Sequence, residues 1–274
     1  MRTSCKLCSF VIAISFVAFI FQAAFARPAA STGAGDKVML DAWYNSQQRK
    51  NDAGQMEYFH YKWSDTKDSG FSLLGSVFQG YGAHLDTLYT APTLENLKGS
   101  QVYIIVSPDI PAKNPNPHYV QPEDAEQVAQ WVKQGGVLLL MENDPGTADI
   151  EHTNLIADHF GIHFNDALSH HVIGNQIASG TIPVSAGGPV FHDSHTLYMK
   201  DTCTISVKKP ATVILRDKGD ILIATAKYGK GTVAAVADPW LYNEYTDGHR
   251  LPAEYDNLAG GKEFVQWLLQ QVRR

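Results

Sequence analysis

The sequence lacks the short motifs that mark several large enzyme classes. It has no Gly-x-Ser-x-Gly nucleophile turn, no Walker phosphate loop, no His-Glu-x-x-His motif and no cysteine pair at zinc-ligand spacing. Gly-x-Gly occurs at residues 33–35 and 229–231, and neither lies between an expected strand and an expected helix. These absences argue against a nucleotide-binding enzyme or a zinc enzyme, and we predict no cofactor and no metal.

The sequence also contains fewer basic than acidic residues. The chain has 22 Lys and Arg against 28 Asp and Glu, which gives a formal net charge of −6. Proteins that bind nucleic acids or anionic membranes concentrate positive charge on one surface, and no dense Lys/Arg cluster is present here. We therefore predict that neither nucleic acid nor the membrane surface is a partner.

Residues 1–26 have the three parts of a secretory signal peptide. Arg2 and Lys6 give a positive start, an apolar run covers 9–25, and Ala-Phe-Ala at 24–26 is a cleavage site of small residues. The run is slightly shorter than the roughly 20 residues of a membrane-spanning helix, and an uncleaved anchor is the alternative. We predict an exported protein, periplasmic or secreted, whose mature chain starts near Arg27.

Cysteine is scarce, and this limits how an exported chain can be stabilised. Of the 3 cysteines, cleavage would remove Cys5 and Cys8 with the signal peptide. Cys203 alone cannot form an internal disulfide, which excludes a small disulfide-stapled module. Cys203 lies in an alternating strand pattern, where a cysteine is more often a small buried residue than a nucleophile.

The sequence does contain an alternation of apolar strands and amphipathic helices. Strands are expected at 37–42, 84–89, 102–106 and 137–141, and helices at 70–82, 93–97, 122–134, 154–160 and 262–272. From about residue 168 the helical pattern stops, and antiparallel strands follow up to a hairpin around 228–231. This order predicts an α/β fold with a mostly parallel sheet, helices on both faces, and an antiparallel β insertion near 168–230. We predict one domain over 37–274 after a flexible terminus at 27–36.

The most distinctive segment follows the last expected strand. Residues 238–248 read DPWLYNEYTDG and contain three aromatic rings and three carboxylates. A loop that only has to turn uses Gly, Asn, Asp and Pro, so these rings indicate that something packs on them. Ligands of open α/β sheets bind at the carboxyl ends of the strands, and rings beside carboxylates suit a sugar. The alternative is that the rings fold back as a satellite core.

Carboxylates also follow several of the expected strands, namely Asp41, Asp109, Glu142, Asp144 and Asp238. Strand ends on one side of a parallel sheet converge, so several of these side chains are expected to share a cleft. Two carboxylates at a suitable separation can cleave a glycosidic bond. The alternative is that they only stabilise turns and helix starts, for which Asp is favoured.

Histidine is concentrated in the middle third of the chain, at His152, His159, His163, His170, His171, His192 and His195. A metal site needs such side chains to converge, usually with a carboxylate. Surface histidines with one or two hydrogen-bonded core ones explain the same enrichment. A metal-dependent enzyme is therefore kept as the weakest of three hypotheses.

The central part of the sequence resembles class I glutamine amidotransferase-like domains. The resemblance rests on three segments: Ile-Ile-Val-Ser-Pro-Asp at 104–109, an expected helix ending in Gly135-Gly136, and Val-Leu-Leu-Leu-Met at 137–141. The resemblance implies a flavodoxin-like, glutamine amidotransferase-like sheet. In that superfamily the next residues carry a cysteine nucleophile, whereas this chain has Glu142-Asn143. Chemistry of the cysteine type is therefore not expected.

A more specific resemblance extends over nearly the whole mature chain. The segments 41–45 (DAWYN), 60–63 (HYKW) and 238–247, followed by Arg250-Leu251-Pro252, resemble the amidotransferase-like module found beside unsaturated rhamnogalacturonyl hydrolases. The catalytic α/α barrel of those hydrolases is absent from this sequence. The resemblance implies a role in pectin breakdown, with a separate glycoside hydrolase as a partner.

Two functions are the main hypotheses. The first is an exported module that binds acidic plant-wall oligosaccharide, and the second is a hydrolase of unsaturated rhamnogalacturonan oligosaccharides. The predicted catalytic carboxyls are Glu142, Asp238 and Asp41. The predicted sugar-binding residues, which we expect to meet at the carboxyl ends of the strands, are Trp43, Tyr44, Trp63, Trp240, Tyr242, Asn243, Glu244 and Arg250.

Overall fold

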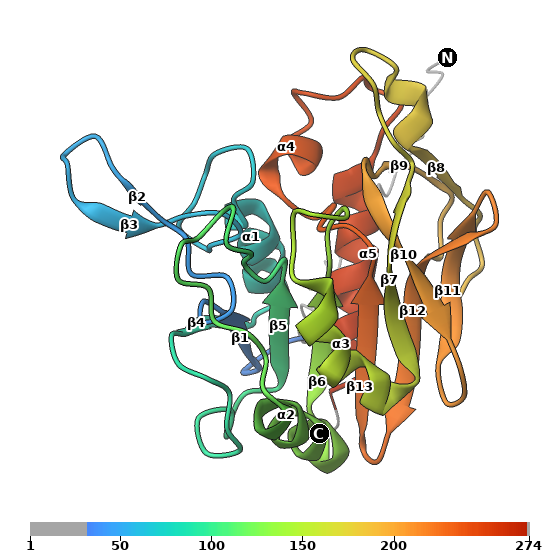
Figure 1. Cartoon of the computed structure of the whole chain (residues 1–274). Coiled ribbons are helices and arrows are strands. Elements are labelled where there is room, and N and C mark those ends of the chain that lie inside the picture. The colour runs from blue at the N-terminus through green and yellow to red at the C-terminus, as the bar shows by residue number, and fades with distance from the viewer. Residues whose placement is uncertain (1–31, 273–274) are drawn as a thin grey trace, which may run out of the picture.

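A computed structural model of the protein describes residues 32–272. Within these residues, nine strands form one sheet in the order β4-β1-β5-β6-β13-β12-β10-β7, with β11 beside β12 (Figure 1). The strands of this sheet are β1 (Lys37–Asp41), β4 (His84–Leu88), β5 (Val102–Val106), β6 (Val137–Met141), β7 (Ile162–Ser169), β10 (Thr202–Val207), β11 (Thr212–Asp217), β12 (Asp220–Tyr228) and β13 (Gly231–Val236). Separate ribbons pair β2 (Gln48–Lys50) with β3 (Met56–Tyr58), and β8 (Thr181–Val184) with β9 (His195–Tyr198).

The helices are α1 (Ser72–Gly80), α2 (Pro122–Gln134), α3 (Ile150–Ala157), α4 (Asn243–Thr246) and α5 (Asn257–Gln270), with short 3-10 turns η1 (Asp158–Phe160) and η2 (Ile177–Gly180). The helices α1, α4 and α5 contact one another on one face of the sheet, and α2 and α3 cover the other (Figure 1).

One half of the sheet is parallel and fully buried. The strands β4, β1, β5, β6 and β13 run in the same direction. Every residue of β5, β6 and β13 is buried, because each of these apolar runs has helices on both sides. The predicted α/β fold with a parallel centre and helices on both faces is confirmed.

The other half is antiparallel, as the change of pattern predicted. The strands β12, β10 and β7 follow β13, each antiparallel to its neighbour, and β11 pairs with β12. This part begins at Ile162, earlier than the predicted 168, directly after Gly161, whose φ of 75° ends the preceding helical turn.

Some helix limits predicted from the sequence agree with the structure and others do not, and side-chain capping explains several of these outcomes. The helix α2 has the predicted limits, since Pro122 opens it, Gln121 and Asp124 form a reciprocal capping box, and Gly135 with φ 131° ends it. The short helix expected at 93–97 was wrong. There the side chains of Thr93 and Asn96 bond to each other's backbone N–H groups and hold a turn instead.

The other two errors are at helix starts. The helix α3 begins at Ile150 and not at 154, because the Asp149 side chain accepts from the backbone N–H of His152. The helix α5 begins at Asn257, five residues before the expected 262, on a first turn that contains Gly260 and Gly261. Two glycines in one turn concealed the helical pattern.

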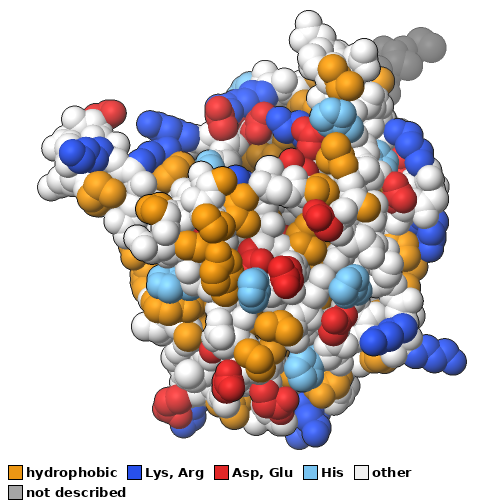
Figure 2. Space-filling view, in the orientation of Figure 1, with side chains coloured by type: hydrophobic (Ala, Val, Ile, Leu, Met, Phe, Trp, Pro, Cys, Tyr) orange, Lys and Arg blue, Asp and Glu red, His pale blue; other side chains and the backbone are white. Residues whose placement is uncertain are grey.

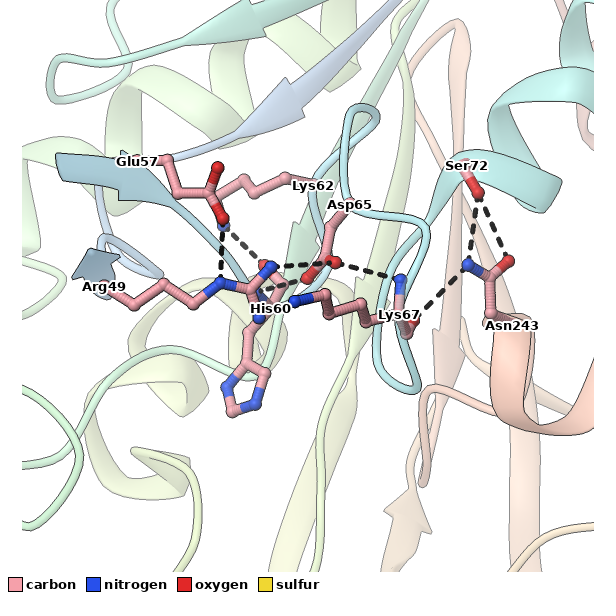
Figure 3. Close-up of polar contacts among 8 residues, drawn as sticks. All are labelled: Arg49, Glu57, His60, Lys62, Asp65, Lys67, Ser72 and Asn243. Atoms are coloured by element: carbon pink, nitrogen blue, oxygen red, sulfur yellow. Dashed lines mark hydrogen bonds and ion pairs between the residues drawn. The ribbon is translucent and has the colours of Figure 1, made fainter. Parts of the chain in front are cut away.

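The polar segment after β1 forms a hairpin that leaves the body of the molecule and a loop that returns to it. The hairpin β2–β3 projects from the molecule (Figure 1). Asp65 then anchors the returning loop, since it accepts from the backbone N–H of His60 at 3.1 Å and from the Arg49 guanidinium at 3.4 Å (Figure 3). Tyr61 is thereby held in the core with 6 % exposure. The Tyr61 ring packs there against Phe71, with ring centroids 5.2 Å apart.

The predicted export signal raises the question of whether any helix of the protein could cross a membrane. No helix described between residues 32 and 272 has both the length and the apolarity that a membrane crossing requires. The predicted signal peptide at 1–26 and the mature start at Arg27 lie outside the described residues. Export therefore stays a prediction.

Candidate functional site

The carboxyl ends of the parallel strands meet at one edge of the sheet, where a hollow opens. Asp41, Ser107, Glu142 and Asp238 lie at or directly after the ends of β1, β5, β6 and β13. Figure 2 shows a depression above this edge, over α4, with acidic and basic side chains around its rim. We take this edge as the candidate site, in agreement with the usual position of ligands in open α/β sheets.

Backbone strain is concentrated at this edge. His60, Tyr61 and Ser107 have φ values of 56°, 48° and 42°, which residues other than glycine rarely adopt. Two of them converge on one amide, because Asn143 Nδ2 donates to Tyr61 Oη at 3.1 Å and lies 3.4 Å from Ser107 Oγ. Strained residues held in place by their surroundings are typical of binding and catalytic sites.

Glu142 and Asp238 are buried carboxyls beside this amide. Glu142 has no exposed surface and Asp238 is 2 % exposed. Among the described residues, the two carboxyl oxygens of Glu142 have no hydrogen-bond partner by distance and angle. The same holds for Oδ2 of Asp238. Burial raises the pKa of Glu142 to about 8, and the nearby Asp149 adds to this shift. Burial, followed by Asp144, raises the pKa of Asp238 well above its usual value. The Glu142 carboxyl is therefore mostly protonated at neutral pH, and burial disfavours the charged form of Asp238 as well.

Asp41 has the turn-stabilising role that the sequence analysis kept as the alternative to catalysis. Its Oδ1 accepts from the backbone N–H groups of Trp43 and Tyr44 at 3.1 and 2.7 Å, and its Oδ2 accepts from Tyr103 Oη at 2.7 Å. Burial raises its pKa to about 6, opposed by these hydrogen bonds. With no exposed surface, Asp41 holds the turn after β1 and does not line the hollow.

Trp240 is the clearest correction to the predicted sugar site. It has no exposed surface and is the largest fully buried side chain, with its ring centroid 6.2 Å from that of Phe264 in α5. The backbone N–H of Trp240 bonds to the carbonyl of Asp238 in a tight turn, which directs the ring inward. The satellite-core alternative is therefore correct for this ring, and Trp240 cannot stack on a sugar.

Three further aromatic residues serve the fold. Tyr44 is fully buried and donates to Asp124 Oδ2 at 2.9 Å, which ties β1 to the start of α2. Trp43 is half-buried and stacks on His118 with ring centroids 3.5 Å apart. Trp63 donates through Nε1 to the carbonyl of Asp86 at 2.9 Å, so its indole closes part of the free edge of β4. The predicted meeting of Trp43, Trp63 and Trp240 in one cleft was wrong.

The segment after Trp240 does reach the candidate site. Tyr242 packs edge-on against Tyr61 with ring centroids 5.7 Å apart, and it is 5 % exposed. The side-chain amide of Asn243 is engaged in the fold, since its Nδ2 donates to Ser72 Oγ and to the carbonyl of Lys67 (Figure 3). Glu244 is half-buried and pairs with Lys200 at 3.5 Å. Arg250 pairs with Asp68 and, at 3.2 Å, with Asp247.

The sequence analysis missed several residues of the site. Tyr61 and Ser107 have no helical or strand pattern of their own, and only their left-handed backbone reveals them. Tyr198 ends β9 in the separate β8–β9 ribbon and packs on Tyr245 with centroids 5.1 Å apart, and Lys200 follows it. The approach of this ribbon to the carboxyl edge of the sheet could not be read from the order of elements alone.

The histidines of the middle third do not converge. Among residues 32–272, no group of three or more His, Cys, Asp or Glu side chains is placed to hold a metal ion. His170 bonds to Asp217 at 2.8 Å through Nε2, and His195 bonds to Asp256 at 2.7 Å and Glu263 at 3.2 Å. These contacts fasten β-strands to their neighbours and to α5, which accounts for the two buried histidines.

Cys203 behaves as a core residue. It is fully buried, its Sγ lies 3.3 Å from the carbonyl oxygen of Ala237, and burial raises its pKa well above the usual value. We expect a thiol reagent to leave the native protein unlabelled and to label it stoichiometrically once it is unfolded in urea. The measurement is absorbance of the released thiolate reporter. Rapid labelling under native conditions would contradict this and reopen a nucleophilic role.

Comparison with known proteins identifies the fold and no family. No protein-family model and no curated protein matches the chain. Its structure is similar to the mmIFT52 N-terminal domain, with a TM-score of 0.58, 17% identity, and coverage of 78% of this chain and 92% of that one. It is also similar to cytoplasmic protein STM1381 from Salmonella typhimurium LT2, with a TM-score of 0.56, 13% identity, and coverage of 87% and 100%. At these identities the likeness concerns the fold alone.

Proposed function

We propose that the protein binds a hydroxyl-rich ligand, a sugar or short oligosaccharide, in the hollow at the carboxyl edge. The observation that carries this proposal is the convergence of Tyr61 and Ser107 on Asn143, next to Glu142 and at the same edge as Asp238, two buried carboxyls whose pKa values are raised by burial. Fixed amide, hydroxyl and protonated carboxyl groups both donate and accept hydrogen bonds, as sugar hydroxyls require. The half-exposed Asn143 is the member of this group closest to solvent.

The charge around the hollow favours a neutral ligand over an acidic one. Asp144, Glu244 and Asp201 all raise the pKa of Asp238, and Lys200 opposes them. Since Lys200 already pairs with Glu244, its positive charge is partly neutralised. A uronate carboxylate would meet like charge here. We therefore favour neutral sugar units over the acidic oligosaccharide that the sequence resemblance implies.

A hydrolase is the second candidate, and the raised pKa of Glu142 is the observation that favours it. A carboxyl with a pKa of about 8 is protonated at neutral pH and suits a general acid. Against this, the Glu142 side chain has no exposed surface, so a substrate oxygen would reach it only after the loops above it move. Binding without turnover is the better supported of the two.

The wider setting of the proposal comes from the sequence resemblance. A helix ending in Gly135-Gly136 that leads into β6, with Glu142-Asn143 at its end, supports a flavodoxin-like, amidotransferase-like module without its cysteine nucleophile. Within this proposal the protein is exported and works beside a separate glycoside hydrolase in pectin breakdown. The predicted partner and compartment both rest on the sequence.

Calorimetric titration tests the proposal. The purified protein should bind a neutral rhamnose-containing disaccharide more tightly than an unsaturated rhamnogalacturonan disaccharide. Asn143→Ala should weaken the neutral-sugar affinity at least tenfold, equal to about 1.4 kcal/mol. The control Gln79→Ala removes an exposed amide on α1 and should leave the affinity unchanged.

The outcomes separate the hypotheses. Failure of all saccharides to bind would reject the proposed function. Release of product by the wild type, abolished by Glu142→Gln, would replace binding with hydrolysis. Tighter binding of the acidic disaccharide would reject the charge argument alone.

A further inference from the structure

A second groove lies away from the hollow, on the face covered by α3. It has a volume of about 560 Å³ and runs between α3, β7 and the loops that follow β5 and β6. A neighbouring depression of about 310 Å³ shares Asp158 and His163 with it and continues along β7 to β10. The two together form an elongated surface that fits an extended chain better than a compact molecule.

The floor of this groove is built from fixed contacts. The Asn154 side chain bonds to both backbone groups of Phe164, with Nδ2 to the carbonyl at 2.9 Å and Oδ1 from the N–H at 2.8 Å. This closes the outer edge of β7 against α3. Asp158 and His163 are joined across the shared end by a bond of 3.0 Å to Nδ1. The shape of the groove therefore follows from secondary structure and not from a loop.

The wall of the groove carries strong negative charge. Its acidic lining residues are Asp149, Glu151, Asp158 and Asp166. No Lys or Arg is among the described residues that line the larger groove, and Lys208 is the basic residue that lines the smaller depression. Figure 2 shows acidic and histidine side chains gathered on this face around α3. Such a surface attracts a cationic ligand and repels an acidic one.

Asp149 lines the groove but is mostly buried. It is 7 % exposed, and its Oδ1 accepts from His152 Nδ1 at 2.9 Å. Its Oδ2 is enclosed by the protein and has no hydrogen-bond partner among the described residues, so a ligand in the groove does not reach it without local movement. The acidic side chains that a ligand can reach directly are therefore the exposed Glu151, Asp158 and Asp166.

The groove also offers apolar surface, contributed by Ile110 and Leu155, with Ile150 and Phe164 buried beneath it. Leu155 is 39 % exposed, which is high for a leucine on a helix that faces its own sheet. A small amine would leave this apolar surface uncovered. A peptide with alternating basic and apolar side chains would cover both parts.

We propose that the α3 groove is the docking site of a partner protein, which it binds through an extended segment bearing Arg or Lys between apolar residues. The carboxylates of Glu151, Asp158 and Asp166 pair with the basic side chains, and Leu155 receives an apolar one. This inference uses none of the residues proposed to contact the sugar, although Asp149 of the groove lies near Glu142.

Calorimetric titration of the full chain at low ionic strength, with the acetylated peptide amide LRALRAL as probe, tests the inference. The wild type should bind it, and the same peptide with citrulline in place of arginine should not. The triple variant Glu151→Gln, Asp158→Asn, Asp166→Asn should lose at least tenfold in affinity, and Leu155→Ser should also weaken binding. Unchanged melting temperatures would show that the variants fold.

A matched triple variant, Asp52→Asn, Asp193→Asn, Glu254→Gln, removes the same charge from exposed positions outside the groove and should change the affinity less than twofold. Equal losses in the two triple variants would overturn the proposal in favour of general charge attraction. Spermidine binding as tightly as the peptide would overturn it in favour of a small amine. Absence of peptide binding to the wild type would also overturn it.

Discussion

Replacing Trp240 by alanine should lower the free energy of unfolding by about 3–5 kcal/mol, the usual cost of deleting a large buried aromatic side chain. The ring has no exposed surface and packs between the turn after β13 and Phe264 of α5. Its removal leaves a cavity where the last strand meets the last helix. Urea denaturation followed by circular dichroism measures the loss.

A conservative variant makes this prediction specific. Trp240→Phe keeps most of the ring and removes an indole N–H that has no partner among the described residues. It should therefore cost much less than the alanine variant. An alanine variant with wild-type stability would show that the ring is not part of the core, and the stacking role expected from the sequence would need to be tested again.

The second large effect is a dependence of stability on pH that originates in Glu142. Its pKa is about 8 in the folded protein against an ordinary value of 4.5 for a glutamate side chain. The folded state therefore holds a proton that the unfolded state has lost between these two values. Stability is greatest below the unfolded pKa and falls as pH rises, by about 1 kcal/mol per unit from this group, until the folded pKa is passed.

Glu142→Gln removes this titration. The variant should match the wild type near pH 5 and be more stable by a few kcal/mol at pH 9, as measured by urea denaturation at both values. Taking the difference between the two proteins cancels the contribution of every other titrating group. The exposed control Glu254→Gln should leave the wild-type pH profile unchanged. A Glu142→Gln profile parallel to that of the wild type would mean that Glu142 ionises normally.

The predictable part of the fold was the part governed by local pattern. The apolar runs of β5, β6 and β13 and the caps of α2 carry their own signals, and these elements lie where the sequence indicated. A helix was wrongly expected at 93–97, where reciprocal side-chain capping holds a turn, and the early start of α5 was missed because paired glycines mask its helical periodicity.

The site was predictable only in outline. The order of elements correctly brought Glu142 and Asp238 to one edge of the sheet, since parallel strands end together. It could not distinguish rings that face solvent from rings that face the core: Trp240 turns inward because its backbone closes a tight turn at Asp238. Nor could it reveal Tyr61 and Ser107, whose role depends on a left-handed backbone and a contact with Asn143.

The position of β13 has a consequence for how the protein is made. This strand is the last to be synthesised among those described, yet it lies in the middle of the sheet, between β6 and β12. The parallel half and the antiparallel half can join only after residue 236 has left the ribosome, so the native sheet cannot close on a partial chain. A chain whose sheet stays open until then exposes unpaired strand edges and remains a substrate for chaperones during its synthesis.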